Sequence, residues 1–231
     1  MVKNLEKKKD KISVIIRTRN EERWIGHAIQ SILDNLNKPE IIIVDNNSTD
    51  ETLSVVRYFM QDPKLESKNK KYTNIKIFKI DFYTPGKALN FGVSKCSNDN
   101  IMIMSAHCIL NKINQKQLIK NLKSYCCIFG NQNPIFRGKR ITKRYIWSNF
   151  TNKKVENMFS KQENRYFLHN ALSVFPKKIL KKYPFDENLA GKEDRYWIND
   201  IIKKGKKFLY DPDLSADHHY TINGNTWKGI G

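Results

Sequence analysis

The stretch Ile12-Ser-Val-Ile-Ile16 decides the fold, because short apolar runs rich in β-branched residues are typical of strands that are buried on both faces of a parallel sheet. The loop Arg17-Thr-Arg-Asn20 follows it. Apolar residues then recur with helical spacing from Trp24 to Leu36, and Asn20 is available to cap that helix. This order predicts a strand, a loop and a helix.

The same order occurs twice more along the chain. A second buried strand is predicted at 40–44, and Ser48-Thr-Asp-Glu51 then reads as the capping box of a helix. A third strand is predicted at 75–80, followed by a helix that begins near Pro85, and a fourth at 101–104. Three strand-helix units with right-handed crossovers predict an α/β fold with a mostly parallel sheet flanked by helices. Such sheets bind ligands at the carboxyl ends of their strands.

The second half of the chain is less regular. A helix around Leu118 and a strand at 126–129 are predicted, and a later helix contains Trp197, before a last strand that ends at Asp211-Pro212. Residues 131–164 are irregular, basic and aromatic, and two interpretations stay open: an acceptor-side loop or lid, or a disordered excursion. At 231 residues we expect a single domain over 12–231, preceded by a basic tail at 1–11.

The chain is strongly basic, with 42 Lys and Arg against 23 Asp and Glu and a net charge of +19. Such a charge attracts phosphates of any kind, but the lysines are spread through the sequence, so no specific nucleic-acid partner is predicted. Two lysine clusters lie at 177–182 and 203–207. They are suited either to peripheral contact with an anionic membrane or to a solvated face.

The cysteines and the absence of long apolar runs indicate the compartment. The four cysteines show no CxxC spacing, which favours buried free thiols in a reducing cytoplasm and makes a structural zinc site improbable. The first ten residues are charged and no apolar signal region follows them, and no apolar run approaches the roughly 20 residues that cross a bilayer. We therefore expect a soluble cytoplasmic protein, with the inner face of the membrane as its one site of peripheral contact.

Five segments taken together resemble the family 2 glycosyltransferases, which have the Rossmann-like GT-A fold. They are Ser13 to Glu22, Val44 to Asp50, Gly86 to Asn90, Ser105-Ala106-His107 and Gly191 to Asp194, in the right order and spacing. The resemblance implies a nucleotide-sugar half at 12–108 and an acceptor half at 109–231. It also implies transfer of a sugar from a nucleotide-sugar donor, a UDP-sugar being favoured, to a hydroxyl of a glycan or lipid-linked acceptor.

The resemblance also implies which residues bind the donor. Near the base and ribose it places Thr18, Asn20, Glu21, Asp45 and Asn47, and near the donor sugar and phosphates Lys87, Asn90 and Ser105. The chemistry agrees for Asp45, because an acceptor-only carboxylate at a strand end can read a base N–H or a hydroxyl. The Lys87 assignment is also chemically reasonable, because the positive end of the helix dipole repels a lysine at a helix start unless an anion such as a phosphate is near. Loop capping and a solvated lysine remain the structural alternatives.

The sequence departs from this family at its metal site. Most members have Asp-x-Asp, which holds Mg²⁺ or Mn²⁺, where this chain has Ser105-Ala-His107. Imidazole suits Mn²⁺ better than Mg²⁺, so Mn²⁺ is favoured. The polypeptide N-acetylgalactosaminyltransferases are similar in using Asp-x-His with a later histidine, which implies His218 or His219 as a second ligand. Two alternatives stay open: metal-independent stabilisation of the leaving group by His107, Lys87 and arginines, or a purely structural His107.

The acidic pair Glu193-Asp194 opens the predicted helix that contains Trp197. By resemblance Asp194 is the general base of an inverting transfer, and Glu193 orients the acceptor or the base. Both acids also suit an ordinary helix start. Two rival functions are a catalytically inactive binding or scaffold protein, suggested by the missing Asp-x-Asp, and a sugar nucleotidyltransferase, which would normally have glycine in its first loop.

Overall fold

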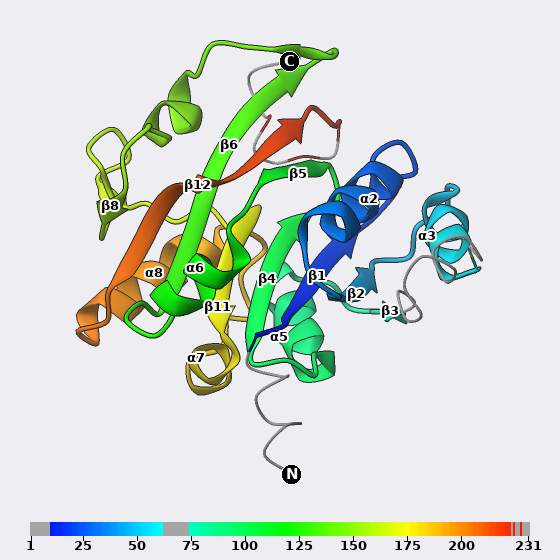
Figure 1. Cartoon of the computed structure of the whole chain (residues 1–231), viewed down its shortest axis with the longest axis horizontal. Coiled ribbons are helices and arrows are strands. Elements are labelled where there is room, and N and C mark those ends of the chain that lie inside the picture. The colour runs from blue at the N-terminus through cyan, green and yellow to red at the C-terminus, as the bar shows by residue number, and fades with distance from the viewer. Residues whose placement is uncertain (1–9, 62–73, 223, 225–226, 228–231) are drawn as a thin grey trace.

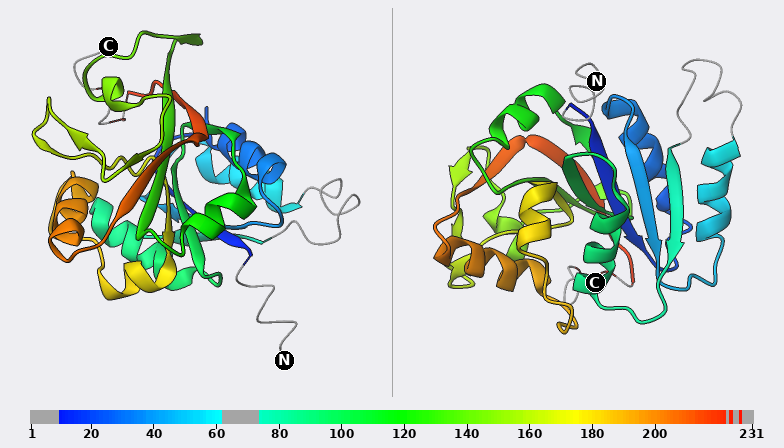
Figure 2. Two further views of the ribbon diagram at one scale, coloured as in Figure 1. Left: turned by 60° about the vertical axis from the view of Figure 1, so that its left-hand side comes forward. Right: turned by 90° about the horizontal axis from the view of Figure 1, so that it is seen from below.

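A computed structural model gives the structure of the protein and describes residues 10–61, 74–222, 224 and 227 (Figure 1). Four parallel strands form one half of its main sheet, in the order β3 (Ile75–Lys79), β2 (Glu40–Asp45), β1 (Ile12–Thr18) and β4 (Asn100–Ser105). Strands β1, β2 and β3 lie side by side in the right-hand view of Figure 2. Of the predicted basic tail, residues 1–9 lie outside the described residues.

The other half of the sheet is mixed. Its strands are β11 (Leu172–Pro176), β6 (Cys127–Phe136), β12 (Phe208–His219) and β5 (Cys108–Lys112). Strand β11 is antiparallel to both of its neighbours, β4 and β6, whereas β12 is parallel to β6 and β5 is antiparallel to β12. Short strands β7 (Lys139–Arg140) and β8 (Val155–Glu156) pair with β6 and β12, and β9 (Phe159–Ser160) pairs with β10 (Arg165–Tyr166).

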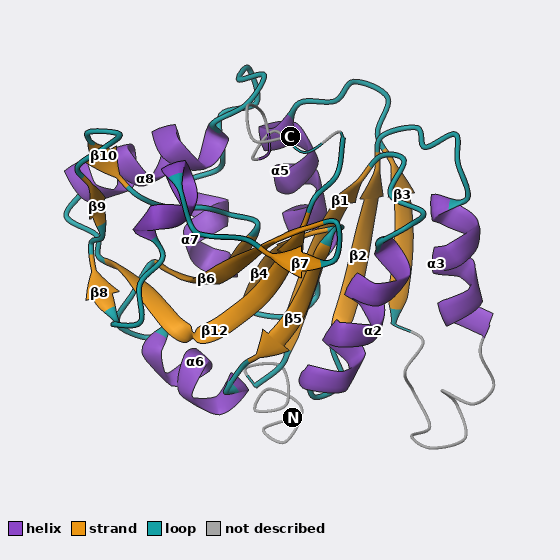
Figure 3. Cartoon of the chain, turned by 90° about the horizontal axis from the view of Figure 1, so that it is seen from above, coloured by secondary structure: helices purple, strands orange, loops and turns teal. Residues whose placement is uncertain are grey.

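Helices cover both faces of the sheet. Helices α2 (Ile25–Asn35), α3 (Thr52–Gln61) and α6 (Gln115–Asn121) pack with one apolar cluster, and α5 (Pro85–Lys95), α7 (Lys177–Lys182) and α8 (Glu193–Lys203) with the other (Figure 3). Consecutive strand residues point to opposite faces, so Ile16 belongs to the first cluster and Ile15 to the second. The predicted single α/β domain with a mostly parallel sheet flanked by helices is confirmed.

The last strand is longer than predicted. It runs from Phe208 to His219 and passes through Pro212, where the sequence predicts its end. The pairing of β12 with β6 shifts register between Asp211 and Ser215. Proline lacks the N–H that a regular ladder needs and is tolerated at such irregularities, so the prediction was wrong about where the strand stops. As a result His218 and His219 belong to the strand and do not follow it.

Both predicted helix caps were wrong. Helix α2 begins at Ile25, and Asn20 instead joins two loops, because its backbone N–H donates to Ser48 Oγ (3.0 Å) and its Oδ1 accepts from Thr49 N (2.8 Å). The Ser48 hydroxyl accepts from Asn20 N and donates to Asp45 Oδ1, so the predicted capping box does not form. Helix α3 begins later, at Thr52, whose N–H donates to Asp50 Oδ1 (3.0 Å).

The stretch 131–164, for which a loop or lid and a disordered excursion are both open, contains defined structure. It includes the end of β6, the short strands β7 to β9 and the 3₁₀ helix η1 (Tyr145–Asn149). Trp147 in η1 is fully buried and packs edge-on against His218, with ring centroids 5.0 Å apart. The disordered alternative was therefore wrong. No helix within the described ranges is both long and apolar enough to cross a membrane.

Candidate functional site

A cavity of about 710 Å³ opens at the carboxyl edge of the parallel strands. The register places three strand ends there side by side, because Thr18 pairs with Asp45 and Arg17 pairs with Ser105. The first turn of α8 closes the cavity. Its lining comprises Arg17 to Glu21, Asn46, Tyr83, Pro85, Ser105 to His107, Ile146, His169 to Ala171, Gly191 to Arg195 and Gly224. The cavity thus lies where an open α/β sheet binds its ligands.

Four of the predicted donor-binding residues line this cavity: Thr18, Asn20, Glu21 and Ser105. Thr18 Oγ1 and Glu21 Oε2 are buried and have no hydrogen-bond partner among the described residues. An unpaired buried polar atom costs free energy unless it finds a partner. These two oxygens are therefore suited to bind a polar ligand in the cavity.

Asp45 lies behind the cavity wall and does not line it. It is fully buried, and both of its carboxylate oxygens accept hydrogen bonds from Ser48, from the hydroxyl at 2.5 Å and from the backbone N–H at 3.1 Å. Asn47 lies in the adjoining turn with a φ of 52° and is exposed, outside the lining. The residue between them, Asn46, reaches the cavity instead and was missed by the sequence prediction.

Lys87 and Asn90 also lie outside the cavity lining. Asn90 Oδ1 accepts from the backbone N–H of Phe185 (3.0 Å), and its Nδ2 donates to Phe185 O (2.9 Å) and to Glu187 Oε1 (2.9 Å). The Lys87 ammonium lies 5.5 Å from the ring centroid of Phe82. In this structure Asn90 therefore links α5 to the 185–187 segment.

The start of α5 tightens the same link. Thr84 caps the helix by accepting from Lys87 N (3.1 Å), and its hydroxyl donates to Glu187 O (2.7 Å). A Cβ on Gly86 would lie 2.1 Å from Asp186 O, so only glycine permits this approach. We call residues 84–90 the latch, because they hold the segment that leads to α8.

The acids of α8 enter the cavity from its first turn. Glu193 is 5% exposed, and its Oε1 accepts from Arg17 Nη1 (3.0 Å) and from Asn170 Nδ2 (3.1 Å). Asp194 Oδ2 accepts from the backbone N–H of Asn170 (3.2 Å). Burial, together with the charge of Glu193, raises the pKa of Asp194 to about 6. A carboxylate with that proton affinity suits general-base catalysis near neutral pH.

His107 and His218 come together although 111 residues separate them. His107 Nδ1 donates to Glu21 Oε1 (3.0 Å), because a carboxylate oxygen accepts, and its Nε2 lies 3.1 Å from His218 Nε2. His218 is fully buried, and its Nδ1 donates to Gln132 Oε1 (2.8 Å). Burial, assisted by the neighbouring histidines, lowers the pKa of His218 well below its ordinary value.

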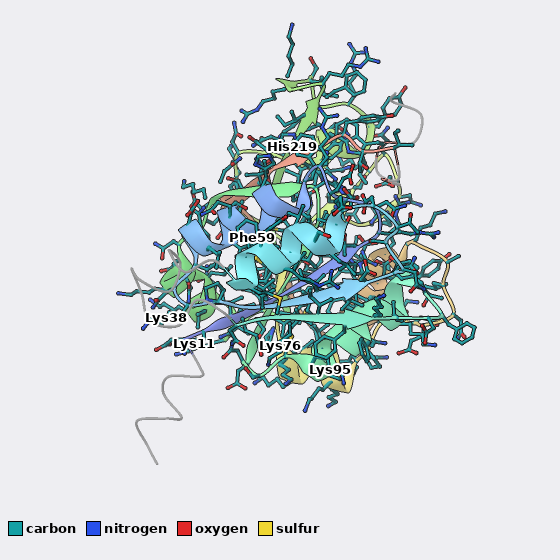
Figure 4. The ribbon with its side chains drawn as sticks, turned by 90° about the vertical axis from the view of Figure 1, so that its right-hand side faces the viewer. Lys11, Lys38, Phe59, Lys76, Lys95 and His219 are labelled. Atoms are coloured by element: carbon teal, nitrogen blue, oxygen red, sulfur yellow. The ribbon has the colours of Figure 1, made fainter. Side chains whose placement is uncertain are left out.

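His219 does not join this pair. Successive side chains of a strand point to opposite faces, so His219 points away from His218. Its ring stacks on Trp24 with centroids 4.1 Å apart, and its backbone N–H donates to His107 O (2.9 Å). Figure 4 shows it well separated from Lys11 and Lys38, which precede the first two strands. Of the two histidines that the sequence offers as a second ligand, the structure brings only His218 to His107.

The histidine pair fits a metal ion in part. Within residues 10–61 and 74–222, no group of three or more His, Cys, Asp or Glu is arranged to hold one. Two imidazole nitrogens bound at right angles to one metal, each at about 2.1 Å, would lie about 3.0 Å apart. The distance of 3.1 Å between His107 Nε2 and His218 Nε2 matches that geometry. The pair can therefore supply two ligands to a cation that takes its others from a bound molecule.

Several cavity residues were missed because sequence reasoning followed only the carboxyl ends of parallel strands. Strand β11 is antiparallel to β4, so its amino end reaches the cavity and brings His169 and Asn170 with it. Gln132 is buried in β6 outside the cavity lining, where it contacts His218, and no motif marks it. Arg17 and Arg195 flank the predicted residues and add positive charge to the lining. The antiparallel reversal was the one signal that could have located His169 and Asn170.

Comparison with known proteins places the chain in a family. The model of the family described as "Glycosyl transferase family 2" matches residues 13–184. A β-1,3-glucosyltransferase of Campylobacter jejuni, named for its GalNAc(5)-diNAcBac-PP-undecaprenol acceptor, is 28% identical over 210 residues, covering 86% of this chain and 61% of its own. A dolichyl N-acetyl-α-D-glucosaminyl phosphate 3-β-D-2,3-diacetamido-2,3-dideoxy-β-D-glucuronosyltransferase of Methanococcus voltae is 33% identical over 225 residues, covering 90% and 66%.

Among solved structures, GalNAc-T7 with UDP, GalNAc and Mn²⁺ has a TM-score of 0.70 at 17% identity, over 93% of this chain and 44% of that one. This likeness concerns the fold. The chain spans about three fifths to two thirds of the length of the two curated relatives. Because the family model covers well over half of the 231 residues, the chain belongs to glycosyl transferase family 2.

Proposed function

We propose that this chain is the catalytic part of a glycosyltransferase that moves a sugar from a nucleotide-sugar donor, a UDP-sugar being favoured, to a hydroxyl of a glycan or lipid-linked acceptor. One observation carries the proposal: a single cavity is lined by Thr18 and Glu21 with their unpaired oxygens, by Asp194, and by His107, whose Nε2 lies 3.1 Å from the buried His218 behind the cavity wall. The names of the Campylobacter and Methanococcus relatives, which contain a lipid-linked acceptor, support it.

Residues 12–108 form the donor half in this proposal, and residues 109–231 the acceptor half. Thr18, Asn20 and Glu21 bind the nucleoside together with Asn46, and Arg17 and Arg19 attract its phosphates. Asp45, Asn47, Lys87 and Asn90 act from outside the lining: the first two shape the loop after β2 and the last two belong to the latch. Ser105 remains at the strand end beside the diphosphate.

His107 and His218 hold the metal ion in this proposal, and Mn²⁺ is favoured over Mg²⁺ because imidazole is a better ligand for Mn²⁺. Held there, a divalent ion would supply positive charge to neutralise the diphosphate leaving group. Glu21 accepts a hydrogen bond from the Nδ1–H of His107, which leaves the lone pair on Nε2 free. The presence of UDP and Mn²⁺ in the similar GalNAc-T7 structure supports this assignment.

Asp194 is the general base of the proposed transfer. It removes the proton from the acceptor hydroxyl as that oxygen attacks the anomeric carbon from the face opposite the departing diphosphate, which inverts the configuration. Glu193 is held by Arg17 and Asn170 and positions the loop beside it. The raised pKa of Asp194, about 6, supports this division between a buried ion-paired acid and a reactive one.

Peripheral contact with an anionic membrane, at the inner face and from the cytoplasm, completes the proposal. It is motivated by the lipid-linked acceptors in the names of the two relatives and by the net charge of +19.

Turnover of a panel of UDP-, GDP-, dTDP- and CMP-sugars by the full chain, with Mn²⁺ and with EDTA, tests the function. We expect hydrolysis or transfer of a UDP-sugar that Mn²⁺ stimulates and EDTA abolishes. His107→Ala should lose the Mn²⁺ stimulation, and the matched control His219→Ala should keep it. Turnover that EDTA does not affect would support the metal-independent mechanism. No binding and no turnover with any donor would contradict the transferase and favour a scaffold protein.

A further inference from the structure

Each of the two paired imidazoles has a fixed partner on its outer nitrogen. Glu21 Oε1 lies 3.0 Å from His107 Nδ1, and Gln132 Oε1 lies 2.8 Å from His218 Nδ1. Both partners are acceptors, so each Nδ1 carries a proton. A neutral imidazole has only one N–H. When both rings are neutral, each Nε2 therefore carries a lone pair, and the two atoms lie 3.1 Å apart, close enough for one cation beside them to bind both.

The orientation of the Gln132 amide follows from its other neighbour. Gln132 is fully buried in β6, and its second amide atom lies 3.0 Å from His169 Nδ1 and 3.4 Å from His169 O. A backbone carbonyl only accepts hydrogen bonds, so the atom that faces it is Nε2. The oxygen Oε1 then faces His218, as the structure has it. The fold thus leaves Gln132 one orientation, in which it accepts from His218.

We propose that Gln132 is a positioning residue for the metal and diphosphate site. Its amide oxygen keeps the proton of His218 on Nδ1 and so leaves the Nε2 lone pair free for a cation that His107 Nε2 would also bind. Glu21 acts in the same way on His107 from the other side. This inference rests on the proposed function for the identity of the ligand. It assigns a role to a residue that touches neither metal nor donor and acts through His218.

Three variants of β6 separate the role of Gln132 from general packing. Gln132→Met keeps the volume but removes the acceptor, so we expect His218 to move its proton to Nε2 and donate to His107. Gln132→Glu keeps an oxygen acceptor for His218, whether ionised or protonated, and should retain the Nδ1–H form. The matched control is Asn133→Leu, because the Asn133 amide belongs to the same strand but donates to Asp217 Oδ1 (3.0 Å) instead of accepting from His218.

Two measurements on the full chain test whether Gln132 sets the proton position on His218 and supports metal binding. Long-range ¹H–¹⁵N NMR of histidine-labelled, metal-free protein reports which nitrogen of His218 carries the proton. Electron paramagnetic resonance titration of Mn²⁺ in the presence of UDP reports metal affinity. We expect Gln132→Met to show the Nε2–H form and to bind Mn²⁺ about 10- to 100-fold more weakly than wild type. Gln132→Glu and Asn133→Leu should keep the Nδ1–H form and bind within about threefold of wild type.

The inference is overturned if Gln132→Met keeps the Nδ1–H form of His218, or if its Mn²⁺ affinity falls no further than that of Asn133→Leu. The NMR measurement needs neither metal nor activity. If the wild type binds neither Mn²⁺ nor UDP, the proposed function fails, whereas the proton position on His218 still decides whether Gln132 sets it.

Discussion

Asp194 combines a buried position with a catalytic task, and both affect its titration. Burial and the charge of Glu193 raise its pKa to about 6. A general base must be ionised, so we predict that kcat/KM falls about tenfold per pH unit below pH 6 and is level above pH 7. The profile should be measured from pH 5 to 8 with saturating Mn²⁺, and UDP affinity over the same range is the control. A level profile down to pH 5 would remove Asp194 from the role of base.

Asp194→Asn tests the same residue in two independent ways. It should lower kcat by about 10²-fold or more while UDP affinity stays within about twofold. It should also stabilise the protein at high pH. A pKa raised in the folded state means that the neutral form is favoured on folding, and this contribution is present below about pH 4 and lost as pH rises through 6. Asparagine stays neutral throughout.

The expected gain for Asp194→Asn at pH 8 is on the order of 1–3 kcal/mol, which corresponds to a Tm increase of a few degrees for a chain of this length. The gain should shrink towards pH 4, where Asp194 is protonated in the folded state and about half protonated in the unfolded state. Thermal unfolding of both proteins at pH 8 and pH 4.5 checks the sign. An equal Tm at pH 8 would show that ionised Asp194 costs little in this cavity.

Sequence motifs located the ends of β1, β2 and β4 correctly but did not decide which of two consecutive residues faces the cavity. After β2 it is Asn46 and not Asp45 that lines it, because Ser48 holds both carboxylate oxygens of Asp45. Before β11 it is the antiparallel direction of the strand that brings Asn170 to the cavity. Both outcomes depend on contacts between segments far apart in sequence, and the local spacing of residues carries no information about such contacts.

At the scale of elements, hydrophobic periodicity predicted the positions of β1 to β4 and of α2, α3 and α5. It failed at β12, because Pro212 is compatible with a strand only where pairing is irregular. Here Asp211 and Ser215 of β12 pair with the consecutive residues Gly130 and Asn131 of β6, which the sequence of β12 alone does not reveal. Because of this error, the sequence analysis did not recognise His218 and His219 as consecutive strand residues whose side chains point to opposite faces. With that alternation known, only one of the two histidines could have been predicted as a second ligand beside His107.

The latch at 84–90 provides the prediction at this scale. Asn90→Ala leaves the backbone N–H and C=O of Phe185 without their partner, so we expect it to lower the free energy of unfolding by roughly 1–3 kcal/mol. It should also lower kcat, because the latch holds the segment leading to Asp194. Lys87→Ala is the control from the same helix and should change neither. Urea unfolding and initial rates measure both effects.

A different pattern for these two variants would support the prediction from sequence that Lys87 and Asn90 contact the donor. If Lys87→Ala raised the KM for the donor several-fold and Asn90→Ala did so without loss of stability, both residues would be donor contacts. The cavity would then have to close over α5 when the donor binds.

At the scale of the whole molecule, the two lysine clusters and the cavity lie at different edges of the sheet. Strand β11 pairs Leu172 with Met104 near the cavity and Pro176 with Asn100 at the start of β4, so α7 begins at the far edge. Helix α8 begins at the cavity and ends at Lys203, away from it. Lys11 and Lys38 also precede their strands at the far edge (Figure 4). The lysine clusters therefore do not surround the cavity.

The cavity mouth has its own charges and exposed rings. Arg19, Lys192 and Arg195 line the cavity, and Phe82, beside the lining residue Tyr83, is 79% exposed. Tyr196, beside Arg195, is 57% exposed. An acceptor whose lipid stays in the bilayer must present its sugar to this mouth, so contact with the membrane is expected here and not at the lysine clusters. Exposed aromatic rings beside basic side chains are suited to the surface of an anionic membrane, because the rings can enter its apolar layer while the cations contact the headgroups.

Vesicle binding distinguishes the two orientations. On vesicles with 30% phosphatidylglycerol, which we choose to supply anionic charge, the pair Phe82→Ser and Tyr196→Ser should weaken binding several-fold. The control triple Lys178→Gln, Lys181→Gln and Lys182→Gln should change it by less than about threefold. At about 1 kcal/mol per lysine near an anionic surface, the triple would cost more than 100-fold if α7 faced the bilayer. That loss would mean that the cavity faces away from the lipid, and a membrane-held acceptor could then reach Asp194 only by leaving the bilayer.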